Sequence, residues 1–168
     1  ASIQVKTTGT LIGNLCVATP ASDIAPALAV FGAELRIAGS GSERTLTIED
    51  FCVGVKQCAL QNGELVKELM IPPLPAGAVS AFLKLARTTA VIAKVNVAVM
   101  LTLSNNTCNE AKIAFGSVAP TVLRAKKAEN TLKGNTLDQK TVEAAAQVAA
   151  GEATPITDIR STAEYRQD

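Results

Sequence analysis

A glycine-containing run near the start of the chain carries the residue types best suited to binding an anionic ligand. The run reads Gly9-Thr10-Leu11-Ile12-Gly13-Asn14, and an acidic residue, Asp23, follows shortly after it. Glycine lets the backbone approach a bulky ligand, and turn amides that point one way form a nest for phosphate oxygens. Thr10, Asn14 and Asp23 could then fix a phosphate, a ribityl chain or a ribose hydroxyl. Plain turn and helix-cap chemistry uses the same residue types and stays open as an alternative.

The absence of histidine excludes several kinds of chemistry. The 168 residues contain no His, which removes Ser-His-Asp and Cys-His nucleophile systems and the commonest metal ligand. Sixteen basic and fifteen acidic residues leave a net charge of +1, which offers no bulk attraction to nucleic acid or to anionic lipid. We therefore expect no catalytic residue on this chain and neither a nucleic acid nor a membrane as a partner.

The four cysteines lack the spacing of a metal site. Cys16, Cys52, Cys58 and Cys108 include no C-x-x-C pair, and zinc or iron–sulfur sites normally need such short pairs. We expect four buried or half-buried thiols in a reducing cytosol and no metal bound to this chain. With no signal peptide and no apolar stretch of about 18 residues, the protein is predicted to be soluble and cytoplasmic.

Residues 72–77, Pro-Pro-Leu-Pro-Ala-Gly, divide the chain into two parts. Prolines at this density forbid a helix and interrupt a sheet ladder, so the segment is predicted to be a stiff linker. The expected domains are residues 1–71 and residues 78–168. Both ends read like the interior of a domain, and we expect the chain to be truncated at both.

The first domain is predicted to be α/β. After a turn at residues 9–14, Ser22 or Asp23 caps a helix that stops at Gly32. Alternation of apolar and polar residues predicts a strand hairpin and then a third strand, at residues 33–38, 44–48 and 65–71.

The second domain is predicted to combine a small antiparallel sheet with helices, so the whole chain is α+β. A buried strand over 95–103, a loop at 105–109 and a returning strand over 111–115 form the sheet, while the type of 79–87 stays ambiguous. Helices are expected from Pro120 to Gly134, from a cap at Thr136 to Ala150, and after a cap at Ser161.

The glycine-containing run also resembles a known motif. Residues 8–15 read Thr-Gly-Thr-Leu-Ile-Gly-Asn-Leu, and residues 18–23 read Ala-Thr-Pro-Ala-Ser-Asp. They are similar to the second flavin-contacting motif, roughly Thr-Ile-Gly-Gly-Asn and then Ala-x-Pro-x-x-Asp, of the FAD-binding subunit in the xanthine dehydrogenase/carbon monoxide dehydrogenase family. The resemblance continues in order at residues 48–51, 63–72, 81–87, 92–96, 113–121, 124–129 and 158–166, so it covers nearly the whole chain.

The resemblance implies an FAD-binding electron-transfer subunit of a molybdenum hydroxylase. FAD would accept electrons from iron–sulfur centres and pass them to a final acceptor. The 2Fe-2S clusters and the molybdenum cofactor would lie on an iron–sulfur subunit and a molybdenum subunit. This chain would hold the second FAD subdomain and most of the C-terminal domain, and a separate N-terminal FAD subdomain segment would complete the cofactor site.

The resemblance also assigns the cofactor-binding residues, which are Thr10, Leu11, Ile12, Gly13, Asn14, Asp23, Val66 and Lys84. Thr10, Gly13 and Asn14 would line the FAD phosphates and ribityl chain, and Asp23 would hold a polar group of the cofactor. Val66 would lie near the isoalloxazine ring and Lys84 near its edge.

The chain departs from the family pattern at a few positions. Ile12 stands where the family usually has the first of two glycines, Thr88 replaces a basic residue and Val91 replaces an acid. Two alternatives therefore remain. One is a docking module of the same complex that holds no flavin, and the other is a small α+β binding domain unrelated to flavin.

Overall fold

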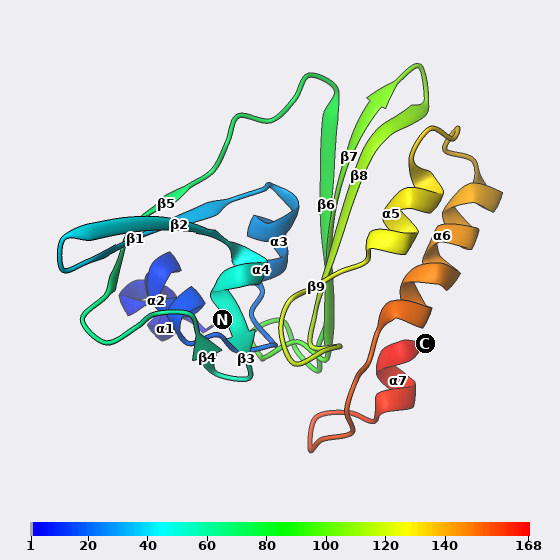
Figure 1. Cartoon of the computed structure of the whole chain (residues 1–168). Helices are drawn as coiled ribbons and strands as arrows, with labels where there is room; N and C mark the ends of the chain where they lie inside the picture. Colours follow the sequence, from blue (N-terminus) through cyan, green and yellow to red (C-terminus); the bar gives the residue numbers. More distant parts are fainter. Residues whose placement is uncertain (1) are drawn as a thin grey trace.

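The computed structural model describes residues 2–168 and shows a three-stranded sheet, a four-stranded sheet and a short two-stranded ribbon, with helices around them (Figure 1). In chain order, the first part contains α1 (Ile3–Thr8), α2 (Leu11–Cys16), α3 (Ile24–Val30), β1 (Glu34–Gly39), β2 (Ser42–Thr47), α4 (Ile48–Phe51), β3 (Cys52–Gly54), β4 (Gln57–Cys58) and β5 (Leu65–Met70). The second part contains β6 (Ala78–Leu85), β7 (Val95–Ser104), β8 (Thr107–Gly116), β9 (Leu123–Arg124), α5 (Lys126–Leu132), α6 (Gln139–Glu152) and α7 (Ala163–Gln167). The predicted α+β class is confirmed.

The three-stranded sheet, called the smaller sheet below, has the order β2-β1-β5 and is antiparallel, and β3 pairs with β4 in a separate two-stranded ribbon. Its hairpin between β1 and β2 turns at Gly41, whose φ of 84° is a conformation that glycine adopts without strain. Leu35 and Ile37 of β1 are fully buried, as the alternation of apolar and polar residues predicts. The hairpin and the third strand are thus found where the sequence predicted them.

The expected turn over residues 9–14 is wrong, because most of this run is helical. Only Gly9 and Thr10 separate α1 from α2, and Thr10 is the N-cap of α2. The Thr10 hydroxyl accepts a hydrogen bond from the Gly13 amide at 2.9 Å, which replaces a backbone partner that the first helical turn lacks. Leu15 is buried on the inner side of α2 and holds this short helix in place.

The larger sheet has the order β6-β7-β8-β9 and is antiparallel throughout. The turn between β7 and β8 consists of Asn105 and Asn106 alone, with φ of 48° and 63°, as in the tight hairpin turns that suit twisted strands. Residues 107–109, predicted as loop, therefore belong to β8. Residues 79–87, whose type the sequence left open, lie largely in the edge strand β6.

The helices of the second part start later than predicted. Residues 123–124 pair with β8 instead of entering a helix, since the edge of β8 offers unpaired backbone groups, and α5 begins at Lys126. Asp138 caps α6 and Thr162 caps α7 through their side chains, where the sequence favoured Thr136 and Ser161. The predicted stop at Gly134 is confirmed, with a φ of 79° just beyond the end of α5.

The larger sheet separates two apolar cores (Figure 1). On one face, Ala98, Met100 and Ala114 pack with α3 and the smaller sheet. On the other face, Ile113 packs with α5 and α6, where buried alanines let the two helices come close. Residues 72–77 connect the parts without helix or strand. In residues 2–168 we find no helix with the length and apolar character that crossing a bilayer requires.

Candidate functional site

Helix α2 presents the predicted glycine-containing run at the surface. Thr10, Leu11 and Gly13 are exposed, and Ile12 and Asn14 are half-buried. The Thr10 hydroxyl accepts from the Gly13 amide. The amides of Leu11 and Ile12 are therefore the donors of the first helical turn that have no hydrogen-bond partner among the described residues. The run therefore offers two backbone donors, next to the polar side chain of Asn14.

Asn14 is linked to the start of α3 through Ser22. The Ser22 hydroxyl donates to Asn14 Oδ1 at 2.6 Å and accepts from the amides of Ile24 and Ala25 at 3.2 and 3.1 Å. Because its hydroxyl accepts from these first-turn amides, buried Ser22 is the capping side chain of α3, and Asp23 makes no side-chain cap bond. The sequence left these two cap candidates open, and the structure selects Ser22, which leaves the Asp23 carboxylate available for other partners.

The Asp23 carboxylate is held from the larger sheet. Lys84 Nζ of β6 contacts Asp23 Oδ2 at 2.6 Å, and Asn96 Nδ2 of β7 donates to Asp23 Oδ1 at 3.0 Å. The Lys84 side chain is 16% exposed and that of Asp23 is 34% exposed, so the ion pair lies in a partly desolvated position at the edge of the site. One connected polar cluster thus contains Asn14, Asp23 and Lys84, although Asn14 and Lys84 are 70 positions apart in the sequence.

Val66 lies outside this hydrogen-bonded cluster. It sits on β5 opposite Ile37 of β1, half-buried against the apolar core. Helix α2 contacts β5, so Val66 belongs to the strand that neighbours the glycine-containing run. Of the eight predicted site residues, seven come from α2 and the polar cluster, and Val66 contributes the adjacent apolar side chain.

Asn96 is a member of the cluster that sequence reasoning missed. Its side chain is buried and also donates to the Ser22 carbonyl at 3.1 Å. The available signal was an amide near the start of a mostly apolar strand, because a buried polar side chain needs partners of defined position. The identity of those partners was not visible in the sequence, since they lie more than 70 residues away.

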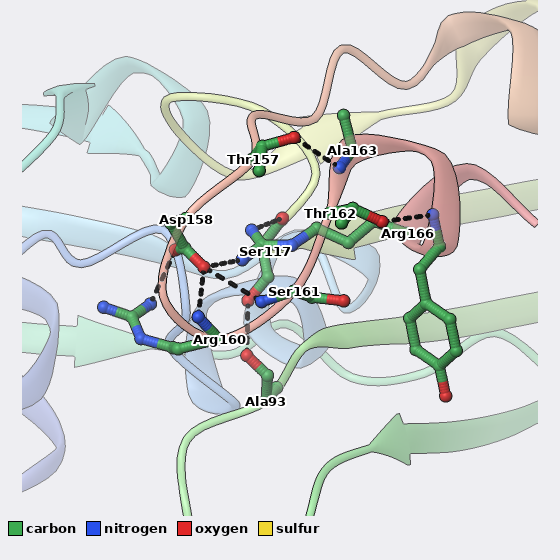
Figure 2. A network of polar contacts seen from close by, with 10 residues as sticks. Ala93, Ser117, Thr157, Asp158, Arg160, Ser161, Thr162, Ala163 and Arg166 are labelled. Atoms are coloured by element: carbon green, nitrogen blue, oxygen red, sulfur yellow. Dashed lines mark hydrogen bonds and ion pairs between the residues drawn. The ribbon is translucent and has the colours of Figure 1, made fainter.

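A second polar network joins Ala93 and Ser117 to the last helix (Figure 2). The Ser117 amide donates to the Pro20 carbonyl at 2.8 Å, and the Ser117 hydroxyl donates to the Ala93 carbonyl at 3.1 Å. Buried Arg166 of α7 donates to the Ser117 carbonyl at 2.9 Å and to Asp158 Oδ1 at 2.5 Å. The Arg160 amide and then Arg166 lower the pKa of Asp158, which keeps its carboxylate charged.

The thiols are poorly suited to chemistry. Burial, with a smaller contribution from neighbouring Cys58, raises the pKa of Cys52 to about 11, so this thiol stays protonated at neutral pH. Burial also raises the pKa of Cys16. Across residues 2–168 we find no group of three or more His, Cys, Asp or Glu side chains arranged to hold a metal ion.

Two families of known proteins match the chain in succession. Residues 1–74 match the FAD binding domain in molybdopterin dehydrogenase, and residues 80–168 match the CO dehydrogenase flavoprotein C-terminal domain. The boundary between the matches falls at the proline-rich segment. The polar cluster built by Asn14, Asp23, Lys84 and Asn96 draws residues from both matched regions.

Individual relatives show the same pattern. The carbon monoxide dehydrogenase medium chain of Afipia carboxidovorans is 32% identical over 97% of this chain, and the xanthine dehydrogenase FAD-binding subunit of Escherichia coli O157:H7 is 29% identical over 97%. The structure of carbon monoxide dehydrogenase from Hydrogenophaga pseudoflava superimposes with a TM-score of 0.95 at 32% identity, covering 99% of this chain and 58% of that chain. The chain spans 57% and 56% of the two curated relatives. It belongs to the family of flavoprotein subunits that join the FAD-binding domain of molybdopterin dehydrogenases to a CO dehydrogenase flavoprotein C-terminal domain.

Proposed function

We propose that the chain binds FAD at the surface formed by α2, the start of α3 and the end of β6. The observation that carries this proposal is the polar cluster of Asn14, Ser22, Asp23 and Lys84, which lies within the chain that matches an FAD-binding family. In this proposal, residues 1–71 are the second FAD-binding subdomain, 72–77 the linker and 78–168 the C-terminal domain.

The residues of this surface suit a dinucleotide. The Leu11 and Ile12 amides and the Thr10 hydroxyl offer donors to phosphate oxygens, with Gly13 and Asn14 beside them for the ribityl chain. The partly exposed Asp23 carboxylate can accept from a hydroxyl while Lys84 balances its charge. Val66 on the adjacent strand supplies an apolar surface of the kind that a flat ring system requires.

Exposed apolar side chains on α2 and on the neighbouring strand β5 fit a further component in the site. Leu11 is 53% exposed and Leu65, at the start of β5, is 60% exposed. Exposed large apolar side chains, where they gather into a patch, are typical of surfaces that a ligand or another segment covers. We propose that FAD and an N-terminal FAD subdomain segment cover them together.

We further propose that the protein is the flavoprotein subunit of a cytoplasmic, hetero-oligomeric molybdenum hydroxylase. Partner subunits would carry the 2Fe-2S clusters and the molybdenum cofactor. Bound FAD would supply the electron-transfer chemistry, taking electrons from the iron–sulfur centres and giving them to a final acceptor. This chain's own residues bind the cofactor, fix its orientation and exclude water from its inner face, and none of them needs to act as a catalytic base.

Flavin retention tests the proposal directly. The chain, supplemented with an N-terminal FAD subdomain, should take up FAD with the flavin absorbance spectrum, and acid release should yield FAD by mass spectrometry. Asn14→Ala should weaken FAD binding at least about tenfold through loss of a ligand contact and of the Ser22 bond. Asn130→Ala, a matched change at an exposed position of α5, should leave binding unchanged. A colourless protein that still assembles with its partner subunits would contradict FAD binding and favour a docking module.

A further inference from the structure

We propose that Asn96 is a positioning residue of the flavin site, a statement that rests on the proposed function of Asp23 as a cofactor contact. Asn96 comes from the C-terminal part of the chain, on β7, and its side chain is directed at the loop that precedes α3. Its task is to fix the orientation of the Asp23 carboxylate and the path of the backbone at Ser22.

The contacts of Asn96 leave it one orientation. The amide nitrogen donates both to the Ser22 carbonyl at 3.1 Å and to Asp23 Oδ1 at 3.0 Å, and both partners are acceptors. An amide has one donor end and one acceptor end, so the nitrogen must face the loop and Oδ1 must face the other way. The side chain therefore binds both loop acceptors at once and fixes their positions relative to β7.

The acceptor end of Asn96 is buried without a hydrogen-bond partner among the described residues. It points toward Gly116 of β8, which lies directly opposite Asn96 in the strand register. A Cβ atom at position 116 would overlap Asn96 Oδ1 and lie 3.1 Å from the Pro20 carbonyl oxygen. Gly116 leaves room for the Asn96 amide, whose acceptor oxygen is unpaired. An unpaired buried oxygen lowers stability, so we infer that Asn at position 96 serves to hold the loop.

Neighbouring contacts make the fixed loop part of the site. Lys84, the register partner of Asn96 on β6, binds the other carboxylate oxygen of Asp23 at 2.6 Å. Ser117, next to Gly116, binds the Pro20 carbonyl at 2.8 Å. Residues of β6 and β7 and the residue that follows β8 thus hold residues 20–23, and Asn96 is the member with contacts to both the backbone and the side chain of the loop.

Hydrogen exchange in the cofactor-free chain tests the positioning role without flavin. Asn96→Asp keeps the shape of the side chain but places a carboxylate oxygen against Asp23 and the Ser22 carbonyl. We expect exchange of the Ile24 and Ala25 amides, which bind the Ser22 hydroxyl, to accelerate at least about tenfold. Asn109→Asp, the same change at an exposed position of β8, should leave these amides unchanged. Equal protection in both variants would overturn the proposal.

A reciprocal variant separates positioning from general destabilisation. In Asp23→Asn/Asn96→Asp, the amide and the carboxylate exchange places, so one hydrogen bond between them is restored. We expect slower exchange at Ile24 and Ala25 than in Asn96→Asp alone, even where that single variant folds poorly. Exchange as fast as in the single variant would assign Asn96 a packing role and overturn the proposal.

FAD binding distinguishes this inference from the proposed function. With the N-terminal FAD subdomain present, Asn96→Asp should raise the Kd for FAD at least about tenfold, and Asn109→Asp should not. Unchanged affinity in a protein that binds FAD would overturn the role of Asn96 and leave the function intact. If the unsubstituted protein binds no FAD, the proposed function is wrong, and with it the flavin role of Asn96, while the exchange experiment still decides whether Asn96 fixes the loop.

Discussion

The two faces of the larger sheet, formed by alternate residues of the same strands, make different kinds of contact. On β7, the face toward α3 carries Asn96, followed by small or flexible apolar residues, and its end holds the loop at 20–23 by hydrogen bonds. The face toward α6 carries Val97, Val99 and Leu101. A hollow of about 620 Å³ lies between that face, α6 and α7 and is lined mainly by apolar side chains.

This difference shows that directional hydrogen bonds and non-directional apolar contacts have different functions in one sheet. Hydrogen bonds depend on distance and angle, so the polar face can fix a loop with few residues. Apolar contact scales with buried area and tolerates shifts, so the other face can accept helices at a distance that leaves a hollow. A substitution that shifts one atom should therefore matter more on the polar side than on the apolar side.

The largest effect is expected from Arg166, which links α7 to the polar end of the sheet. Arg166→Met removes the bonds to Ser117 and Asp158 and leaves a carboxylate that is 23% exposed without its buried charged partner. We expect a loss of about 3 kcal/mol in the free energy of unfolding, measured in urea. Arg36→Met breaks an ion pair whose side chains are 39% and 43% exposed and should cost less than about 1 kcal/mol. Equal losses would contradict the importance of the buried network.

The second largest effect is expected from adding a single methyl group on the polar face. Gly116→Ala places a Cβ atom against Asn96 Oδ1 and the Pro20 carbonyl. Because Asn96 is buried and held at its nitrogen, we expect a loss of about 2 kcal/mol in the free energy of unfolding. Thermal unfolding of the cofactor-free chain measures it. A neutral result would show that the Asn96 side chain can move.

The charge of Asp158 should make stability depend on pH. Its pKa is lowered in the folded chain by the Arg160 amide and by Arg166, so its contribution is present above the ordinary Asp value of about 4 and is lost as the pH falls through the folded value. We expect Asp158→Asn to cost about 1–2 kcal/mol near neutral pH and less in acid. Urea unfolding of both proteins near neutral pH and in acid measures this loss. The same difference in the free energy of unfolding at both pH values would contradict the prediction.

Loss of a methyl group on the apolar face should cost less. Ile113 is 7% exposed and faces Val99 across the strands. Ile113→Val should lower the free energy of unfolding by about 1 kcal/mol. The same change at Ile156, which is 66% exposed, should be near neutral. A larger loss at Ile113 than at Gly116→Ala would reverse the comparison between the two faces.

The smallest expected effect is a gain. Gly151 lies in the last turn of α6, and a Cβ atom there would meet no neighbour within 4 Å. Gly151→Ala should raise the free energy of unfolding by about 0.5 kcal/mol. Gly63→Ala changes a glycine with a φ of 83° and should lower stability instead. If urea unfolding shows that both substitutions change the free energy of unfolding in the same direction, the expected effect of backbone conformation is contradicted.

Elements whose signals are local were predictable from the residues. The helix that Ser22 caps, the hairpin of β1 and β2, and strands β5 and β7 follow from caps, alternation and turn glycines within a few positions. The predictions failed where a distant partner decides the conformation. Residues 107–109 and 123–124 become strand because β7 and β8 offer them ladder bonds, and no nearby residue signals this pairing.

For the candidate site, residue types and spacing predicted Thr10, Gly13, Asn14 and Asp23, because short motifs carry local chemistry, whereas Lys84 was predicted only through the family resemblance. The fold was needed to reveal that Ser22 rather than Asp23 caps α3, that Asn96 and Lys84 share the Asp23 carboxylate, and that Arg166 reaches Ser117 across 49 positions. Hydrogen bonds have a range of about 3 Å. Partners far apart in the chain can therefore be identified only after packing has brought the strands and helices together.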